Sequence, residues 1–202
     1  ERVTSEFGGK ELGFKRLATG RRVCTRVFNG SQIIIGCYVD DFLCLTKDEQ
    51  LRAWFESKLR SRFKAIESSH NLEWILNMGL KQYVDSVSKK RCVEVTQTLA
   101  IEKITEMMGL KDCKRTPTPL VEGTKMMRTT TEDESANTSW KYASVLGGVL
   151  YIANVTRPDI AYCAHALTRY LRNPNKHHHD LLKRLVRYLY HTRHVGLKYS
   201  SG

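Results

Sequence analysis

Two adjacent aspartates in the tetrapeptide Tyr38-Val39-Asp40-Asp41 are the side chains whose type and spacing most directly suggest chemistry. Apolar runs of six and five residues flank the tetrapeptide, which therefore lies at the tip of an expected buried hairpin. Adjacent carboxylates repel each other and lose water when their flanks are buried, and a divalent cation offsets that cost. Carboxylate oxygens suit Mg²⁺, which proteins bind through one or two carboxylates together with substrate phosphates. These residues alone leave a solvated Asp-Asp turn open as the alternative, because aspartate is common in turns.

The segments around the aspartates predict three consecutive antiparallel strands. Residues 23–28 and 32–39 flank Asn29-Gly30, the dipeptide most typical of a two-residue hairpin. The Asp-Asp turn then leads into a third apolar strand at 42–46. This order places both aspartates at one end of the sheet.

Helices and a second group of strands are predicted further along the chain. Thr46 and Glu49 have the spacing of a capping box, and apolar residues recur at helical spacing over 51–63. The pattern then predicts strands at 73–84 and 91–96, a helix over 98–109, an exposed connection over 114–139, and helices that begin near Trp140, Pro158 and Pro174. The Thr, Ser, Pro and Glu content of the connection indicates a subdomain boundary.

The charge balance favours a polyanionic partner. The 202 residues include 33 Lys and Arg against 21 Asp and Glu, a formal net charge of +12, and 41% are hydrophobic, enough for a substantial core. Residues 1–30 carry seven basic and three acidic side chains, and residues 157–202 carry nine and two. Two basic ends around a nearly neutral centre indicate the walls of a nucleic-acid groove more than a membrane-binding surface. Solvated basic surface is the alternative.

The six cysteines indicate a reducing compartment. They are scattered without a C-x-x-C pair, so we expect reduced thiols that pack as small apolar side chains. No apolar stretch approaches the roughly 18–20 residues of a membrane span, and there is no secretory signal. Because the first residue is Glu1 rather than methionine, we expect a fragment of a longer protein.

Two groups of basic side chains lie in the predicted C-terminal helices. The side chains of His177, His178 and His179 point about 100° apart on a helix, so they cannot converge on one metal ion and are expected to form a solvated first turn. The second group lies on neighbouring helices with tyrosines among them: Arg169, Arg172, Lys183, Arg184 and Arg187. Phosphate contact and simple solvation are equally open for this group.

Five motifs follow one another in a fixed order. They are Tyr38-Val39-Asp40-Asp41, Thr116-Pro117, Tyr142-x-x-Val145-Leu146-Gly147, Thr156-Arg157-Pro158-Asp159-Ile160, and Leu185-Val186-Arg187-Tyr188-Leu189 with His191-Thr192. Leu12-Gly13-Phe14-Lys15 precedes the hairpin, so the motifs cover nearly the whole chain. In this order the chain resembles the reverse transcriptase of copia-type LTR retrotransposons, over the palm, thumb and connection part of the Pol polyprotein.

The resemblance implies an α+β fold, in which an antiparallel palm-like sheet with packed helices is followed by an all-helical thumb/connection subdomain. Residues 1–113 would hold part of the palm and the start of the thumb, 114–139 the exposed connection, and 140–202 the helical region that precedes RNase H. The implied activity is RNA-directed DNA polymerisation, a two-metal nucleotidyl transfer onto a primer 3′-hydroxyl. The implied cofactor is Mg²⁺, with Mn²⁺ as a substitute.

The same resemblance implies roles for individual residues. Two carboxylates would hold metal and act in catalysis, mainly Asp40 with Asp41 assisting. Primer and nucleotide contacts would fall to Tyr38, Val39, Met78 and Gly79, with the last two in place of a Leu-Gly element. The basic helices would follow the duplex backbone. Implied partners are an RNA template, a DNA primer, deoxynucleotides, and the upstream fingers/palm and downstream RNase H segments. The implied location is the cytoplasm, in a virus-like particle, or the nucleus.

The chain departs from the family pattern in its catalytic carboxylates. Such polymerases use three, one of them on an upstream palm strand, whereas this chain has no aspartate before Cys37. The usual Lys-Asp-Leu-Gly run is also missing at 66–69, so no general acid is identified there. We therefore expect that the chain alone does not polymerise. A non-catalytic nucleic-acid-binding remnant or domesticated fragment is the alternative, and a structural subunit paired with a full-length copy is a third possibility.

Overall fold

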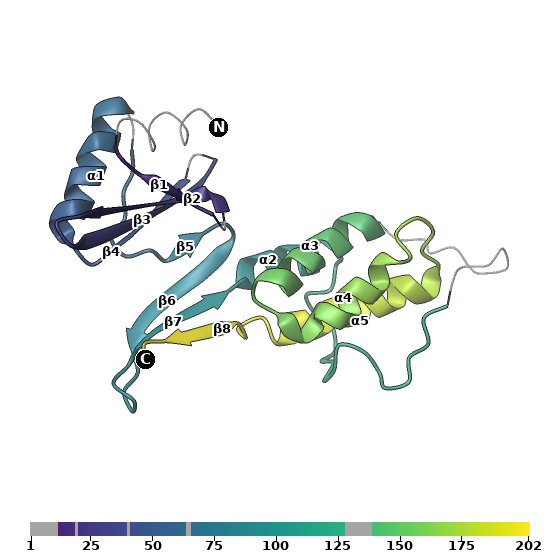
Figure 1. Cartoon of the computed structure of the whole chain (residues 1–202). Helices are drawn as coiled ribbons and strands as arrows, with labels where there is room; N and C mark the ends of the chain where they lie inside the picture. Colours follow the sequence, from purple (N-terminus) through teal and green to yellow (C-terminus); the bar gives the residue numbers. More distant parts are fainter. Residues whose placement is uncertain (1–11, 19, 40, 64–65, 128–138) are drawn as a thin grey trace. The chain divides into compact units, whose positions relative to one another are not determined.

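The structure is a computed structural model that describes residues 12–18, 20–39, 41–63, 66–127 and 139–202. These residues form two antiparallel four-stranded sheets and five α-helices (Figure 1), which confirms the α+β part of the predicted fold class, while the palm-like and thumb assignments stay predictions. The chain divides into two compact units, residues 1–69 and 70–202.

The described residues of unit 1 form a sheet with one helix packed on it. Its strands lie in sequence order, and its elements are β1 (Lys15–Leu17), β2 (Gly20–Phe28), β3 (Ser31–Tyr38), β4 (Asp41–Thr46) and α1 (Glu49–Arg62). Ile33 and Ile35 alternate with more exposed residues and pack in one core with Leu51, Phe55 and Leu59 of α1. The period-two pattern of the strand and the helical period of α1 together produce this core.

The turn at Asn29-Gly30 is confirmed. Both residues have positive φ, 48° and 79°, as a two-residue hairpin between Phe28 and Ser31 requires. The predicted cap of α1 is wrong by two residues, because Asp48 accepts from the backbone N–H groups of Gln50 and Leu51.

Unit 2 combines the second sheet with a helical bundle. Its sheet has the order β5-β6-β7-β8, and its elements are β5 (Trp74–Ile75), β6 (Met78–Val84), β7 (Arg91–Thr96), α2 (Thr98–Met107), α3 (Tyr142–Val155), the 3₁₀ turn η2 (Pro158–Ile160), α4 (Ala161–Thr168), α5 (Lys176–His191) and β8 (Leu197–Ser200). Val145, Leu146 and Val149 of α3 are fully buried with Leu182 and Leu185 of α5. Each such side chain contributes about 1.5–3 kcal/mol on burial.

The expectation that the chain is all-helical beyond residue 140 is wrong at β8. Strand β8 returns to the sheet and pairs with β7, from Leu197 opposite Val95 to Ser200 opposite Cys92. The apolar and aromatic side chains of this short strand suit the free edge that β7 offers. Strand formation there therefore depends on a partner that lies about a hundred residues earlier in the chain.

Two chain crossings join the sheet of unit 2 to its bundle. Gln97 links β7 to α2, and residues 192–196 link α5 to β8. Two contacts join these connections to each other. The Thr98 hydroxyl donates to the Arg193 carbonyl oxygen at 3.0 Å, and Arg193 forms an ion pair with Glu102. Gln97 is fully buried and its Oε1 accepts from the Thr156 hydroxyl at 2.8 Å.

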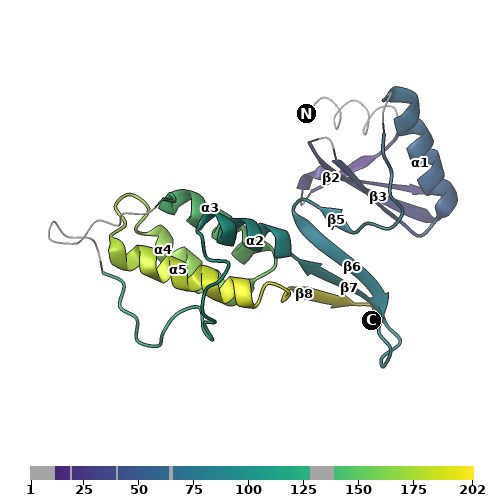
Figure 2. The same cartoon turned by 180° about the vertical axis from the view of Figure 1, so that it is seen from behind.

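Residues 113–127, here called the strap, run along α5 from its last residue to its first turn (Figure 2). His191 Nε2 lies 2.9 Å from the Cys113 carbonyl oxygen, Arg184 donates to Thr118, and His177 Nε2 lies 3.2 Å from the Lys125 carbonyl oxygen. Most strap residues are solvent-exposed, as predicted for the connection, but the strap is held at both ends of α5.

The compact units divide at residues 69 and 70 rather than within the connection. The reason is that Ile101 and Ile104 of α2 share their core with the helices that follow residue 139. The functional division into palm, connection and thumb segments stays a prediction.

Replacement of Gly196 by alanine is expected to lower the free energy of unfolding by about 1–3 kcal/mol, the usual cost of overpacking. An added Cβ would overlap the Val95 carbonyl oxygen and lie 3.0 Å from Thr96 Cγ2. Gly147→Ala is the control, because nothing lies within 4 Å of its Cβ and it should stabilise α3 by about 0.5–1 kcal/mol. Urea unfolding measures both changes, and equal effects would contradict the close approach.

Candidate metal site and nucleic-acid interface

The candidate metal site is the hairpin between β3 and β4. Tyr38 and Asp41 are cross-strand partners, so the turn consists of two residues. Tyr38 is 49% exposed and Val39 76% exposed, and the Asp41 carboxylate is also exposed. Asp40, the predicted main ligand, lies outside the described residues. The hairpin therefore presents one described carboxylate with its aromatic neighbour to solvent.

Val39 adopts φ of 52°, in the left-handed region. A β-branched side chain is rarely found there, because its Cβ substituents crowd the backbone. Backbone strain of this kind costs about 1–3 kcal/mol and concentrates at functional sites. This strain is the structural feature that most clearly separates the hairpin from an ordinary surface turn.

The strands behind the turn provide a rigid and chemically inert base. Phe42 packs edge-on against Phe55 of α1, with ring centroids 6.5 Å apart. Burial, with a smaller effect of Cys24, raises the pKa of Cys37 to about 11, and burial also raises the pKa of Cys44. Both thiols are therefore protonated near neutral pH and do not supply thiolate ligands. Oxygen donors at the tip fit Mg²⁺, which prefers them.

Met78 and Gly79 begin β6, directly after a second two-residue turn at Leu76 and Asn77, both with positive φ. A Cβ at Gly79 would lie 3.3 Å from the Trp74 ring, so glycine leaves room for that ring. The Tyr151 hydroxyl of α3 donates to the Leu76 carbonyl at 2.7 Å and ties the turn to the bundle. Sequence reasoning missed this turn, although its Asn was a usable signal.

The five predicted backbone contacts fall in two groups within unit 2. Arg169 and Arg172 follow α4, close to the start of α5, because Tyr170 stacks on His178 with centroids 3.9 Å apart. The second group, Lys183, Arg184 and Arg187, lies further along α5. At 1.5 Å per residue these side chains start about 7–14 Å beyond His178.

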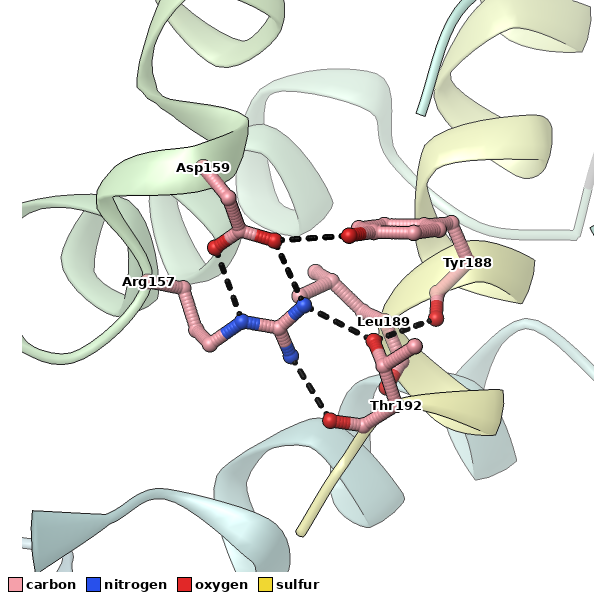
Figure 3. Close-up of polar contacts among 5 residues, drawn as sticks. All are labelled: Arg157, Asp159, Tyr188, Leu189 and Thr192. Carbon is pink, nitrogen blue, oxygen red and sulfur yellow. Dashed lines mark hydrogen bonds and ion pairs between the residues drawn. The ribbon is translucent and has the colours of Figure 1, made fainter. Parts of the chain in front are cut away.

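Arg157 is 1% exposed and lies at the centre of the polar network drawn in Figure 3. Its guanidinium donates to both Asp159 carboxylate oxygens at 2.9 and 2.8 Å, and to the carbonyl and hydroxyl oxygens of Thr192 at 2.9 and 2.7 Å. The Tyr188 hydroxyl donates to Asp159 at 2.8 Å. The network thus joins the segment before α4 to the last turn of α5.

The charges in this network are balanced. Burial alone would raise the pKa of Asp159, but hydrogen bonds from Arg157 and Tyr188 and the Arg157 charge lower it overall. Burial and the Asp159 hydrogen bond raise the pKa of Tyr188, so its hydroxyl stays a donor. The family resemblance rests in part on the motif Thr156-Arg157-Pro158-Asp159, but the sequence alone did not reveal that its arginine is buried.

The predicted solvated turn of three histidines is wrong for two of them. His178 is fully buried, its Nδ1 accepts from the Asn175 N–H at 3.2 Å, and its Nε2 lies 3.0 Å from the Met127 carbonyl oxygen. His179 is also buried, against the rings of Trp140 and Tyr142. The two histidines cap and pack α5 because their rings combine an apolar face with two hydrogen-bonding nitrogens.

Within the described ranges, no group of three His, Cys, Asp or Glu side chains is arranged to hold a metal ion. None of the described helices is both long and apolar enough to cross a bilayer.

Comparison with known proteins finds transposon polyproteins. The chain is 32% identical over 163 residues to a retrovirus-related Pol polyprotein from transposon TNT 1-94 of Nicotiana tabacum, which covers 78% of this chain and 12% of that protein. It is 29% identical over 195 residues to a putative transposon Ty5-1 protein of Saccharomyces cerevisiae, covering 96% and 60%. It is 27% identical over 174 residues to a retrovirus-related Pol polyprotein from transposon RE1 of Arabidopsis thaliana, covering 82% and 11%.

The chain therefore spans about an eighth of the tobacco polyprotein and less than two thirds of the yeast protein. No protein-family model and no solved structure matches it. The resemblance that the five motifs predict is confirmed: the homologues of this chain are retrovirus-related Pol polyproteins from copia-type transposons, at modest identity over most of its length.

Proposed function

We propose that this chain is part of the RNA-directed DNA polymerase of a copia-like retrotransposon. The observation that carries the proposal is the strained two-residue hairpin, which exposes Tyr38, Val39 and Asp41, in a chain homologous to Pol polyproteins. In this proposal unit 1 supplies part of the palm, and the helices of unit 2 supply the thumb and connection.

Asp40 and Asp41 would hold Mg²⁺, or Mn²⁺ in its place. When bound, the metal ions would lower the barrier to nucleotidyl transfer by stabilising negative charge on the attacking and leaving oxygens. Tyr38 and Val39, on the exposed tip, would contact the primer and the incoming deoxynucleotide. Met78 and Gly79, next to the turn that Tyr151 anchors, would position the primer end.

Arg169, Arg172, Lys183, Arg184 and Arg187 would follow the backbone of an RNA–DNA or DNA duplex. We expect that the logarithm of the affinity for a hybrid duplex falls linearly with the logarithm of salt concentration, because each neutralised phosphate releases counterions. Arg184→Glu with Arg187→Glu should weaken binding to all sequences about equally. A fluorescence-anisotropy titration at several salt concentrations measures this.

Lys103→Glu, an exposed charge reversal on α2, is the matched control and should leave the salt dependence of binding nearly unchanged. An affinity that does not depend on salt concentration would contradict a nucleic-acid-backbone interface on α5. So would a loss of affinity in the Lys103 variant equal to that of the Arg184, Arg187 variant.

A non-catalytic nucleic-acid-binding remnant is the second candidate. This chain has no aspartate before Cys37, so the third carboxylate of a two-metal site would come from elsewhere, and the basic helices could bind nucleic acid without catalysis. The remnant and the polymerase would share the basic interface and differ only in primer extension. Extension by a longer polyprotein that contains this chain would exclude the remnant.

A further inference from the structure

The strap carries two Thr-Pro dipeptides that differ in access to solvent. Thr116, before Pro117, is 6% exposed, whereas Thr118, before Pro119, is exposed. The Thr118 hydroxyl oxygen accepts a hydrogen bond from Arg184 Nη2 at 3.0 Å. The two threonines thus share the same following residue, but only Thr118 offers its hydroxyl to an enzyme.

Among the described residues, Arg184, which donates to Thr118, and Arg187 form no ion pair with a carboxylate. Arg184 and Arg187 lie one turn apart on α5, and the Nε–H group of each is buried without a hydrogen-bond partner in the part of the chain that the structure describes. The carboxylates close to this face interact with other residues, Asp180 with Lys183 and Asp159 with Arg157. Buried N–H groups without a partner are costly, and an anion that accepts from the guanidinium groups offsets this cost.

We propose that Thr118 is a phosphorylation site whose phosphate is bound by Arg184 and Arg187. A proline-directed protein kinase would transfer the γ-phosphoryl group of ATP: the Thr118 Oγ1–P bond forms, the bond to the ADP oxygen breaks, and a kinase base takes the hydroxyl proton. The product carries a charge of about −1.5 to −2 and three acceptor oxygens. Planar guanidinium groups bind phosphate oxygens in pairs, so two arginines one turn apart suit this ligand.

The modification would act on the proposed nucleic-acid interface, and this step alone rests on the proposed function. A phosphate paired with Arg184 and Arg187 removes about two positive charges from α5. Because each phosphate contact contributes about −0.9 to the salt slope on B-DNA, the slope should become less steep by about 2. Phosphorylation would thus release the duplex from α5 while the fold is kept.

The first experiment treats the whole chain with a proline-directed kinase and ATP and locates the phosphate by mass spectrometry. We expect modification of Thr118 and its loss in Thr118→Ala, with little at Thr116 in the folded chain. A synthetic peptide spanning residues 110–124 is the control, because it should be modified at both threonines. Equal modification of both sites in the folded chain, or none at Thr118 when the peptide is modified there, would overturn the site.

The second experiment tests the arginine contacts without nucleic acid. Phosphothreonine is installed at position 118 by genetic code expansion, and its second pKa is measured by ³¹P NMR. Two guanidinium groups should hold this pKa about 1 pH unit or more below that of the Arg184→Gln, Arg187→Gln variant. Lys103→Gln is the matched control and should leave it unchanged. If the second pKa of phosphothreonine 118 were the same with and without the two arginines, the proposed pairing would be overturned.

Duplex binding by the phosphorylated chain is measured last. If the unmodified chain binds no duplex, the proposed function fails while the ³¹P result still decides the phosphate site. If the unmodified chain binds and phosphorylation leaves the salt slope unchanged, the regulatory step is overturned.

Discussion

Substitution of Asp40 by asparagine in a longer polyprotein that contains this chain is expected to abolish primer extension. Asparagine keeps the size of the side chain but removes the charge that would hold Mg²⁺, so the attacking and leaving oxygens lose their stabilisation. Extension of a labelled primer on an RNA template, with Mg²⁺ and deoxynucleotides, measures the effect. Asp112→Asn, an exposed aspartate after α2, is the control and should leave extension intact.

One result would contradict this assignment, and a second would contradict the expectation that the chain alone does not polymerise. Primer extension by the Asp40→Asn variant would show that Asp40 is not needed for catalysis. Asp40-dependent extension by the 202-residue chain alone would mean that a carboxylate such as Glu6 or Glu11 completes the site. Metal binding can be followed separately, because Mn²⁺ should broaden amide signals around 38–42. Broadening centred on His177–His179 would place the metal at the wrong end of the chain.

Replacement of Arg157 by leucine is expected to lower the free energy of unfolding by about 3 kcal/mol. Removal of one partner from a buried ion pair usually costs about 3–5 kcal/mol, and the 38% exposure of the Asp159 side chain places this pair at the lower end. The leucine also leaves the carbonyl and hydroxyl oxygens of Thr192 without their donor. Denaturant unfolding measures the change, which should appear as a lower midpoint.

Tyr188→Phe is the control for this network, because it should cause a smaller loss of stability than Arg157→Leu. It removes one hydrogen bond to Asp159 and should cost about 1 kcal/mol. If Tyr188→Phe lowered the free energy of unfolding as much as Arg157→Leu, the stabilisation would come mainly from the tyrosine and not from the arginine.

The same network should make stability depend on acid pH. Because the folded-state pKa of Asp159 lies below its unfolded value, its contribution is present above about pH 4 and is lost as the pH falls through the folded pKa. Asp159→Asn should flatten this part of the stability profile. An unchanged profile would show that other carboxylates cause the acid dependence.

Local sequence patterns predicted much of the secondary structure. Asn29-Gly30 fixed the first hairpin because few dipeptides accept two positive φ angles. Strand β7 has the predicted limits, 91 and 96, and α2 begins at the predicted Thr98, since both elements have clear apolar periods. Pro158 begins a helical segment as predicted, although its first turn is a 3₁₀ helix.

The features that local patterns missed depend on contacts distant in sequence. His178 and His179 are polar by type, and among the described residues the strap and the rings of Trp140, Tyr142 and Tyr170 pack on them. Burial of Arg157 likewise depends on Thr192, thirty-five residues further on. At the hairpin, the sequence predicted that Asp41 lies at the end of the sheet but not the left-handed Val39, because valine disfavours that backbone.

The two adjacent crossings of unit 2 have a mechanical consequence. A bundle on a single linker can swivel freely about that chain, but Gln97 and residues 192–196 connect the same two bodies side by side and are bridged by the Thr98 hydrogen bond. Paired connections resist torsion while still permitting bending about the line that joins them. If a duplex binds the helices as proposed, torque on them would therefore pass into the sheet instead of being lost as free rotation.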